Sequence, residues 1–128
     1  MDDLKSAPVS PQRLAELVET IDVIASSNKV GQYSVGYTAR SPEKRFNEYR
    51  PKNYAHFVIL ATGMKRPAAL NLERALFEAA VSDKSSVLYE KYRDNKRDGP
   101  YRGSPGGKTV GAEEPVHSVY MVWKKSEA

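Results

Sequence analysis

The chain has 128 residues, 40% of them hydrophobic and 28% charged, which is enough for one compact domain with a core and too few for two ordinary domains. It contains no cysteine, which excludes disulfides and thiolate metal sites, and no apolar run approaches the roughly 20 residues of a membrane helix. The polar, acidic N-terminus does not resemble a secretory signal, so we expect a cytoplasmic protein. Residues 1–9 are expected to be a disordered tail in front of a single domain over residues 10–128.

The net charge of +4 is unevenly distributed along the sequence. Residues 1–28 contain two basic and five acidic side chains, so residues 29–128 carry a net charge of +7. Because Lys and Arg side chains that neutralise phosphates release condensed counterions, this excess favours a nucleic acid as partner, with DNA as the expected form and no membrane. A lysine-rich surface that only keeps a small protein dissolved is the alternative explanation.

The first predicted elements are a helix and a strand. Ser10 and Pro11 give the N-cap and first-residue signals of a helix, and apolar residues then recur at helical spacing. Residues 23–25 fit either the last turn of this helix or a short strand. A turn follows, and residues 32–38 fit a strand.

The next predicted elements are a second helix and a second strand. Ser41 and Pro42 repeat the capping signature, and the helix should end near Tyr49 because Pro51 disfavours a helical residue before it. Residues 54–62 are rich in β-branched and apolar residues, which predicts a buried strand.

The C-terminal half continues the alternation of helices, loops and strands. Its predicted elements are a helix opened by Pro67, a helical piece over residues 85–93, a long mobile loop rich in Gly, Pro and basic residues over 94–115, and a strand over 116–123. Tyr120 and Trp123 are expected to pack this final strand against the core.

One candidate site combines an arginine, a tyrosine and a carboxylate. In a helix that starts at Pro42, Arg45 and Tyr49 are four residues apart and therefore lie on one face, and Gly36 before them permits close backbone approach. A guanidinium group can clamp a phosphate, and a tyrosine hydroxyl can position a water. Glu73 could bind a single Mg²⁺ or Mn²⁺ ion that activates water. An ordinary surface pair and a solvated glutamate would give the same pattern.

The order of these pieces resembles that of the GIY-YIG nuclease family over roughly residues 20–80. The segments that carry the resemblance are VGYT at 35–38, SPEKRF at 41–46 and ALNLERAL at 69–76. The resemblance implies that Gly36 is the motif glycine, Arg45 the phosphate-contacting arginine, Tyr49 its aromatic partner and Glu73 the metal ligand. It also implies an α/β (α+β) fold, a small antiparallel sheet flanked by helices, here with an extra N-terminal helix and a C-terminal strand.

One tyrosine of that family has no counterpart at its expected place. The first strand of the family carries a tyrosine that helps to activate water, whereas this chain has Asp22-Val23-Ile24 there. Tyr33 or Tyr37 could substitute. Because strand residues alternate between faces, these two share one face and Ser34, which occupies the tyrosine position of the second motif, lies on the other.

The resemblance implies a metal-dependent endonuclease that hydrolyses nucleic-acid phosphodiester bonds. A GIY-YIG-like domain that binds nucleic acid without cleaving it is the alternative, and a protein-interaction module is a third. A requirement for metal would separate the first from the second, and a steep fall of DNA affinity with salt would separate both from the third.

Basic residues beside this site and in the long loop are the predicted contacts to nucleic acid. Lys65 and Arg66 stand at the start of a helix, where backbone N–H groups favour an anion. Basic residues interleaved with tyrosines near Arg97 fit a flexible arm along a phosphate backbone. Exposed loop cations are the alternative explanation. The full predicted set is Arg40, Lys44, Lys65, Arg66, Arg97, Arg102 and Lys108.

Overall fold

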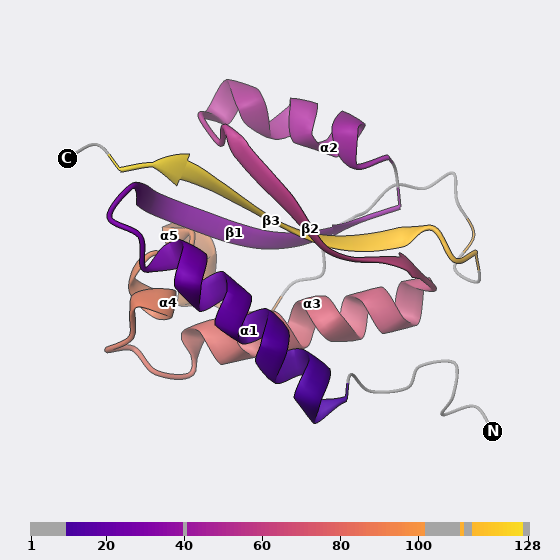
Figure 1. Ribbon diagram of the computed structural model, residues 1–128, viewed down its shortest axis with the longest axis horizontal. Coiled ribbons are helices and arrows are strands. Elements are labelled where there is room, and N and C mark those ends of the chain that lie inside the picture. The colour runs from indigo at the N-terminus through magenta and orange to yellow at the C-terminus, as the bar shows by residue number, and fades with distance from the viewer. Residues whose placement is uncertain (1–9, 40, 102–110, 112–113, 127–128) are drawn as a thin grey trace.

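The computed structural model describes residues 10–39, 41–101, 111 and 114–126, and it contains a three-stranded antiparallel sheet between helices (Figure 1). The expected small antiparallel sheet flanked by helices is therefore confirmed. The elements are α1 (Pro11–Ala25), β1 (Val30–Thr38), α2 (Pro42–Tyr49), a 3₁₀ turn (Arg50–Lys52), β2 (His56–Met64), α3 (Arg66–Val81), α4 (Val87–Glu90), α5 (Asp94–Arg97) and β3 (His117–Lys125).

Serine caps begin two of these helices, as the sequence predicts. The Ser10 hydroxyl accepts a hydrogen bond from the backbone N–H of Arg13 at 3.1 Å, and the Ser41 hydroxyl accepts one from that of Lys44 at 3.3 Å. Each serine is followed by a proline in the first turn. Helix α1 continues to Ala25, so residues 23–25 form its last turn and not a strand.

The strand that comes last in the sequence lies at the centre of the sheet. The strand order is β1-β3-β2, and β3 pairs antiparallel with both neighbours. In this register Tyr120 of β3 lies opposite Gly36 of β1 and Ile59 of β2. Because β3 takes the centre, β2 becomes an edge strand. The expectation of a buried strand over residues 54–62 is thus wrong for most of its length, and Ile59 is 44% exposed.

The two faces of the sheet carry different hydrophobic clusters (Figure 1). Helices α1 and α3 cover one face, where Tyr33, Tyr37 and Met121 are among the buried residues of the larger core. Helix α2 lies on the other face, over a smaller cluster that includes Tyr120 and Tyr54. Alternation along β3 therefore assigns Tyr120 to the α2 face and its neighbour Met121 to the α1–α3 face.

The outer edge of β1 is covered by the chain that follows α4. The backbone N–H of Tyr33 donates to the Lys91 carbonyl at 2.9 Å, and that of Arg93 donates to the Tyr33 carbonyl at 2.8 Å. This pairing at Tyr92 interrupts the helix that was expected over residues 85–93, leaving the two short helices α4 and α5. We call residues 91–101 the strap, because they run from the edge of β1 to helix α3.

No helix among the described residues is both long enough and apolar enough to cross a lipid bilayer.

Candidate active site

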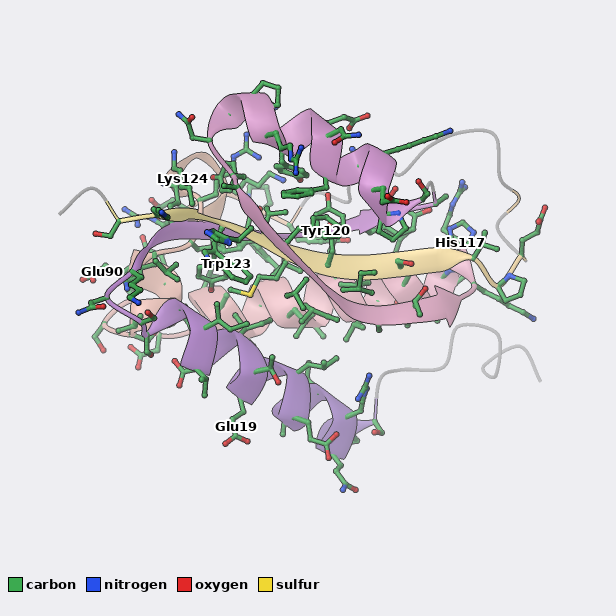
Figure 2. The ribbon with its side chains drawn as sticks, turned by 45° about the horizontal axis from the view of Figure 1, so that its top comes forward. Glu19, Glu90, His117, Tyr120, Trp123 and Lys124 are labelled. Carbon is green, nitrogen blue, oxygen red and sulfur yellow. The ribbon has the colours of Figure 1, made fainter. Side chains whose placement is uncertain are left out.

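The side chain of Tyr120 lies directly against Gly36 of the neighbouring strand. A Cβ atom added to Gly36 would overlap the hydroxyl and ring carbons of Tyr120. A side chain at position 36 would therefore displace the tyrosine. The close approach expected at Gly36 is thus made by another side chain of the same protein. Figure 2 shows Tyr120 projecting from β3 towards α2.

The hydroxyl of Tyr120 forms a pair with that of Tyr49, 2.8 Å away. Tyr49 comes from α2, and its ring packs edge-on against the Tyr120 ring with centroids 5.7 Å apart. Burial, with a smaller contribution from Tyr49, raises the pKa of Tyr120. Tyr120 therefore keeps its proton near neutral pH. In such a pair one hydroxyl donates to the other, and the second proton can be donated to a further acceptor.

Arg45 is a buried cation whose hydrogen-bonding capacity is only partly used. The residue is 9% exposed, and its Nη1 atom forms an ion pair with Glu48 at 3.0 Å. Within the described part of the chain, Nε and Nη2 of Arg45 are buried without a hydrogen-bond partner. Buried guanidinium donors are normally satisfied, so two orphaned ones indicate a place for an anion.

Glu73 is a buried carboxylate that projects from α3. It is 3% exposed, and its Oε1 atom accepts a 2.6 Å hydrogen bond from the Tyr101 hydroxyl at the end of the strap. Burial, followed by this hydrogen bond, raises the pKa of Tyr101, so the tyrosine remains the donor. A buried charge requires such compensation, because desolvation of an isolated carboxylate is costly.

The strap also brings Lys96 into the electrostatic environment of Arg45 and Glu73. Burial lowers the pKa of Lys96, and nearby Arg93, Lys52 and Arg45 lower it further, while Glu73 opposes the shift. The same environment extends to Tyr120, whose pKa responds to both Arg45 and Glu73. Positive charge therefore exceeds negative charge around these groups, which favours binding of an anion.

The structure does not bring Tyr33 and Tyr37 to this place. They point into the core on the α1–α3 face, with exposures of 0% and 1%. The Tyr33 hydroxyl donates to the Leu88 carbonyl at 2.7 Å, and the Tyr37 hydroxyl contacts His117 Nδ1 at 3.0 Å. The expectation that one of them replaces the absent tyrosine is corrected by strand alternation, since Gly36 lies between them in register and faces the opposite side.

The predicted nucleic-acid contacts are scattered over the molecule. Lys44 is exposed on α2, and Lys65 is exposed at the start of α3. Arg66 instead donates from Nε to the Tyr37 hydroxyl at 3.1 Å, which commits it to the core. Arg97 donates to the Glu90 carbonyl at 2.6 Å and lies over the Tyr89 ring. Arg40, Arg102 and Lys108 fall outside the described residues.

The donor set around Glu73 fits a hard divalent cation better than a soft one. The Glu73 carboxylate, with the Tyr101 hydroxyl hydrogen-bonded to it, offers oxygen atoms, and Mg²⁺ and Mn²⁺ prefer oxygen. Residues 10–126, where described, contain no group of three or more His, Cys, Asp or Glu side chains that could share a metal ion. A metal ion here would rest on one carboxylate and complete its coordination with water and phosphate oxygens.

Sequence reasoning missed Tyr120 as a site residue, and it assigned Lys96 and Tyr101 to the flexible arm and not to the surroundings of Glu73. Tyr120 was expected only to pack the last strand, and that packing is confirmed by its 1% exposure. Its partner Gly36 lies 84 positions earlier in the sequence, so no local pattern connects the two. The available signal was a tyrosine in a strand paired with a glycine, which only strand order reveals.

Comparison with known proteins gives no match for this chain among family models, curated proteins or solved structures.

Proposed function

We propose that this protein is a metal-dependent endonuclease of GIY-YIG type that hydrolyses phosphodiester bonds in nucleic acid, with DNA as the expected substrate. The observation that carries the proposal is the pair of buried Arg45 donors that have no partner among the described residues, on a side chain that acts electrostatically on Tyr120 of the Tyr49–Tyr120 pair. A buried guanidinium group with free donors suits a phosphate, which accepts two parallel hydrogen bonds.

Tyr120 supports the family resemblance from an unexpected part of the chain. The family's first strand carries a tyrosine, and here the tyrosine beside the motif glycine comes from β3. If β3 is placed before β1, the elements carry the tyrosine (β3), the glycine (β1), the arginine (α2) and the glutamate (α3) in the order of the family motifs. The chain would then be a circular permutation of the family arrangement. The end of β3 also lies beside the start of β1, where the Ser126 N–H donates to the Lys29 carbonyl at 2.9 Å.

In the proposed reaction each residue has one task. Arg45 binds the non-bridging oxygens of the scissile phosphate through Nε and Nη2. The hydroxyls of Tyr49 and Tyr120 orient the attacking water, which loses its proton to solvent as its oxygen bonds to phosphorus and the bond to the leaving oxygen breaks. Tyr120 acts as a hydrogen-bond donor because burial keeps it protonated. Glu73 holds Mg²⁺ or Mn²⁺, which supplies stabilisation of the charge that develops on the leaving oxygen.

The test is incubation with supercoiled plasmid and labelled oligonucleotides, in Mg²⁺ or Mn²⁺ and in chelator. We expect metal-dependent nicking that Glu73→Gln abolishes. Glu19→Gln is the matched control, since Glu19 points away from the sheet on the outer surface of α1 (Figure 2), and it should cleave like the wild type.

Three outcomes would contradict part or all of this proposal. Cleavage that survives Glu73→Gln would remove Glu73 from the site. Salt-sensitive binding without cleavage would leave the alternative, a nucleic-acid-binding domain that has no catalytic activity. Absence of both cleavage and binding would contradict the nucleic-acid proposal.

A further inference from the structure

The hydroxyl of Tyr101 contacts the carboxylate on which the proposed function depends. It donates to Glu73 Oε1 at 2.6 Å, a short distance typical of hydrogen bonds to charged oxygens. A carboxylate has lone pairs for about four contacts, so one hydrogen bond to Oε1 does not by itself exclude a ligand. The contact can therefore orient the carboxylate without blocking it.

Tyr101 is itself fixed by one surface of α3. Its ring lies 5.9 Å from that of Phe77, and the guanidinium carbon of Arg74 lies 5.7 Å from its centroid. The hydroxyl also reaches the Leu70 carbonyl at 3.4 Å. These three residues and Glu73 recur at spacings of one to four along the helix, so they line one side of α3. A ring that is held on several sides is a rigid support for its hydroxyl.

We propose that Tyr101 is a positioning residue: it fixes the Glu73 carboxylate in the orientation that receives a divalent cation. This inference rests on the proposed metal at Glu73. The tyrosine does not contact substrate. It acts through the carboxylate, as outer hydrogen-bond partners commonly do around metal ligands. If the hydroxyl instead competed with the metal for Oε1, it would weaken metal binding. The rigid seating of the ring argues against this, because the hydroxyl would have to move away when the metal binds.

The direct test compares Tyr101→Phe with Tyr89→Phe. Phenylalanine keeps the packing on Phe77 and removes only the hydroxyl. Tyr89 offers a matched control, because its hydroxyl donates to the Asp98 carboxylate and so holds the same strap without touching Glu73. Binding of Mn²⁺ to each protein is measured by calorimetry in the presence of a phosphorothioate oligonucleotide that resists cleavage, because phosphate oxygens complete the coordination of the metal, and the heat of Mn²⁺ binding to the oligonucleotide alone is subtracted. We expect Tyr101→Phe to weaken Mn²⁺ binding by about 10- to 100-fold and Tyr89→Phe to leave it unchanged.

A second readout does not depend on the metal. Scalar couplings in NMR spectra report whether the Glu73 side chain holds one rotamer. We expect one rotamer in the wild type and in Tyr89→Phe, and averaging in Tyr101→Phe. Unchanged couplings in Tyr101→Phe would overturn the inference. Tighter Mn²⁺ binding by this variant would also overturn it, as would an equal loss of affinity in Tyr89→Phe.

The two proposals fail in different ways. A wild-type protein that does not bind Mn²⁺ would contradict the proposed metal and the cation-receiving role of Tyr101 with it. The couplings would then still decide whether Tyr101 orients Glu73. A wild-type protein that binds Mn²⁺ equally well with and without the Tyr101 hydroxyl would leave the proposed function standing and overturn only the role of Tyr101.

Discussion

Gly36 of β1 and Tyr120 of β3 face each other in neighbouring strands, and the tyrosine ring fills the space that a side chain at position 36 would need. The packing of Tyr120 therefore explains why position 36 is a glycine, without reference to any ligand. It also determines where the Tyr120 hydroxyl lies, and so where it meets Tyr49.

Gly36→Ala should lower the free energy of unfolding by about 1–3 kcal/mol, the usual cost of overpacking a buried site. Urea denaturation measures the change. Gly99→Ala is the control, because a Cβ at that position meets nothing within 4 Å, and its effect should stay within about 0.5 kcal/mol. Equal stability of the two variants would mean that the Tyr120 ring moves aside freely.

Removal of the hydroxyl group should have different effects at Tyr120, in the proposed site, and at Tyr37, in the core. Tyr120→Phe should reduce cleavage about 100-fold or more, the scale of a lost hydrogen-bond donor at the reacting groups. Tyr37→Phe should leave cleavage unchanged and cost about 1 kcal/mol of stability, because His117 and Arg66 lose a buried partner. Single-turnover cleavage and urea denaturation of both variants check this, and a reversed pattern would return the role to Tyr37.

Arg45→Met should abolish cleavage without destabilising the fold. The change breaks the ion pair with Glu48, but Glu48 is 44% exposed and stays solvated, and the change also removes two buried donors that have no partner among the described residues. The melting temperature in phosphate and in chloride of equal ionic strength is the measurement. Phosphate should raise the melting temperature of the wild type more than that of Arg45→Met. A strong loss of stability in both buffers would show that Arg45 is structural.

Lys96→Met should stabilise the protein most at neutral pH. Burial lowers the pKa of Lys96 in the folded state below its ordinary value of 10.5. Below the folded-state pKa the lysine is charged in both states and the full cost of burying the charge applies. Between the folded-state pKa and 10.5 the folded state is already neutral, so the advantage of the variant should shrink as pH rises. Urea denaturation of both proteins from pH 7 to 10.5 follows the difference, and an advantage independent of pH would exclude a role for this charge.

Local signals in the sequence were sufficient for most helices and strands. Ser10 and Ser41 predicted their helix starts because capping needs only neighbouring residues. The position of β3 in the sheet could not be predicted in this way, since strand pairing joins residues far apart in sequence. The prediction that β2 is buried was wrong for the same reason. Its hydrophobic residues do not indicate whether the strand lies at the centre or at the edge of the sheet.

The candidate site was predictable only where its residues share one helix. Arg45 and Tyr49 were paired correctly on α2 by their spacing of four residues. The places of Tyr120, Lys96 and Tyr101 at the site could not be predicted, because each reaches it through a tertiary contact. Tyr33 and Tyr37 are close to Gly36 in sequence, but alternation along β1 turns them to the opposite face of the sheet.

The central position of β3 has a consequence for synthesis of the chain. Strands β1 and β2 are not hydrogen-bonded to each other, so neither has its sheet partner until residues 117–125 have left the ribosome. A nascent chain that has already made Arg45 and Glu73 still lacks Tyr120 and the strand that carries it. If the proposed activity is correct, a translation product that stops before residue 117 would be inactive, because it lacks both Tyr120 and the strand that joins β1 to β2.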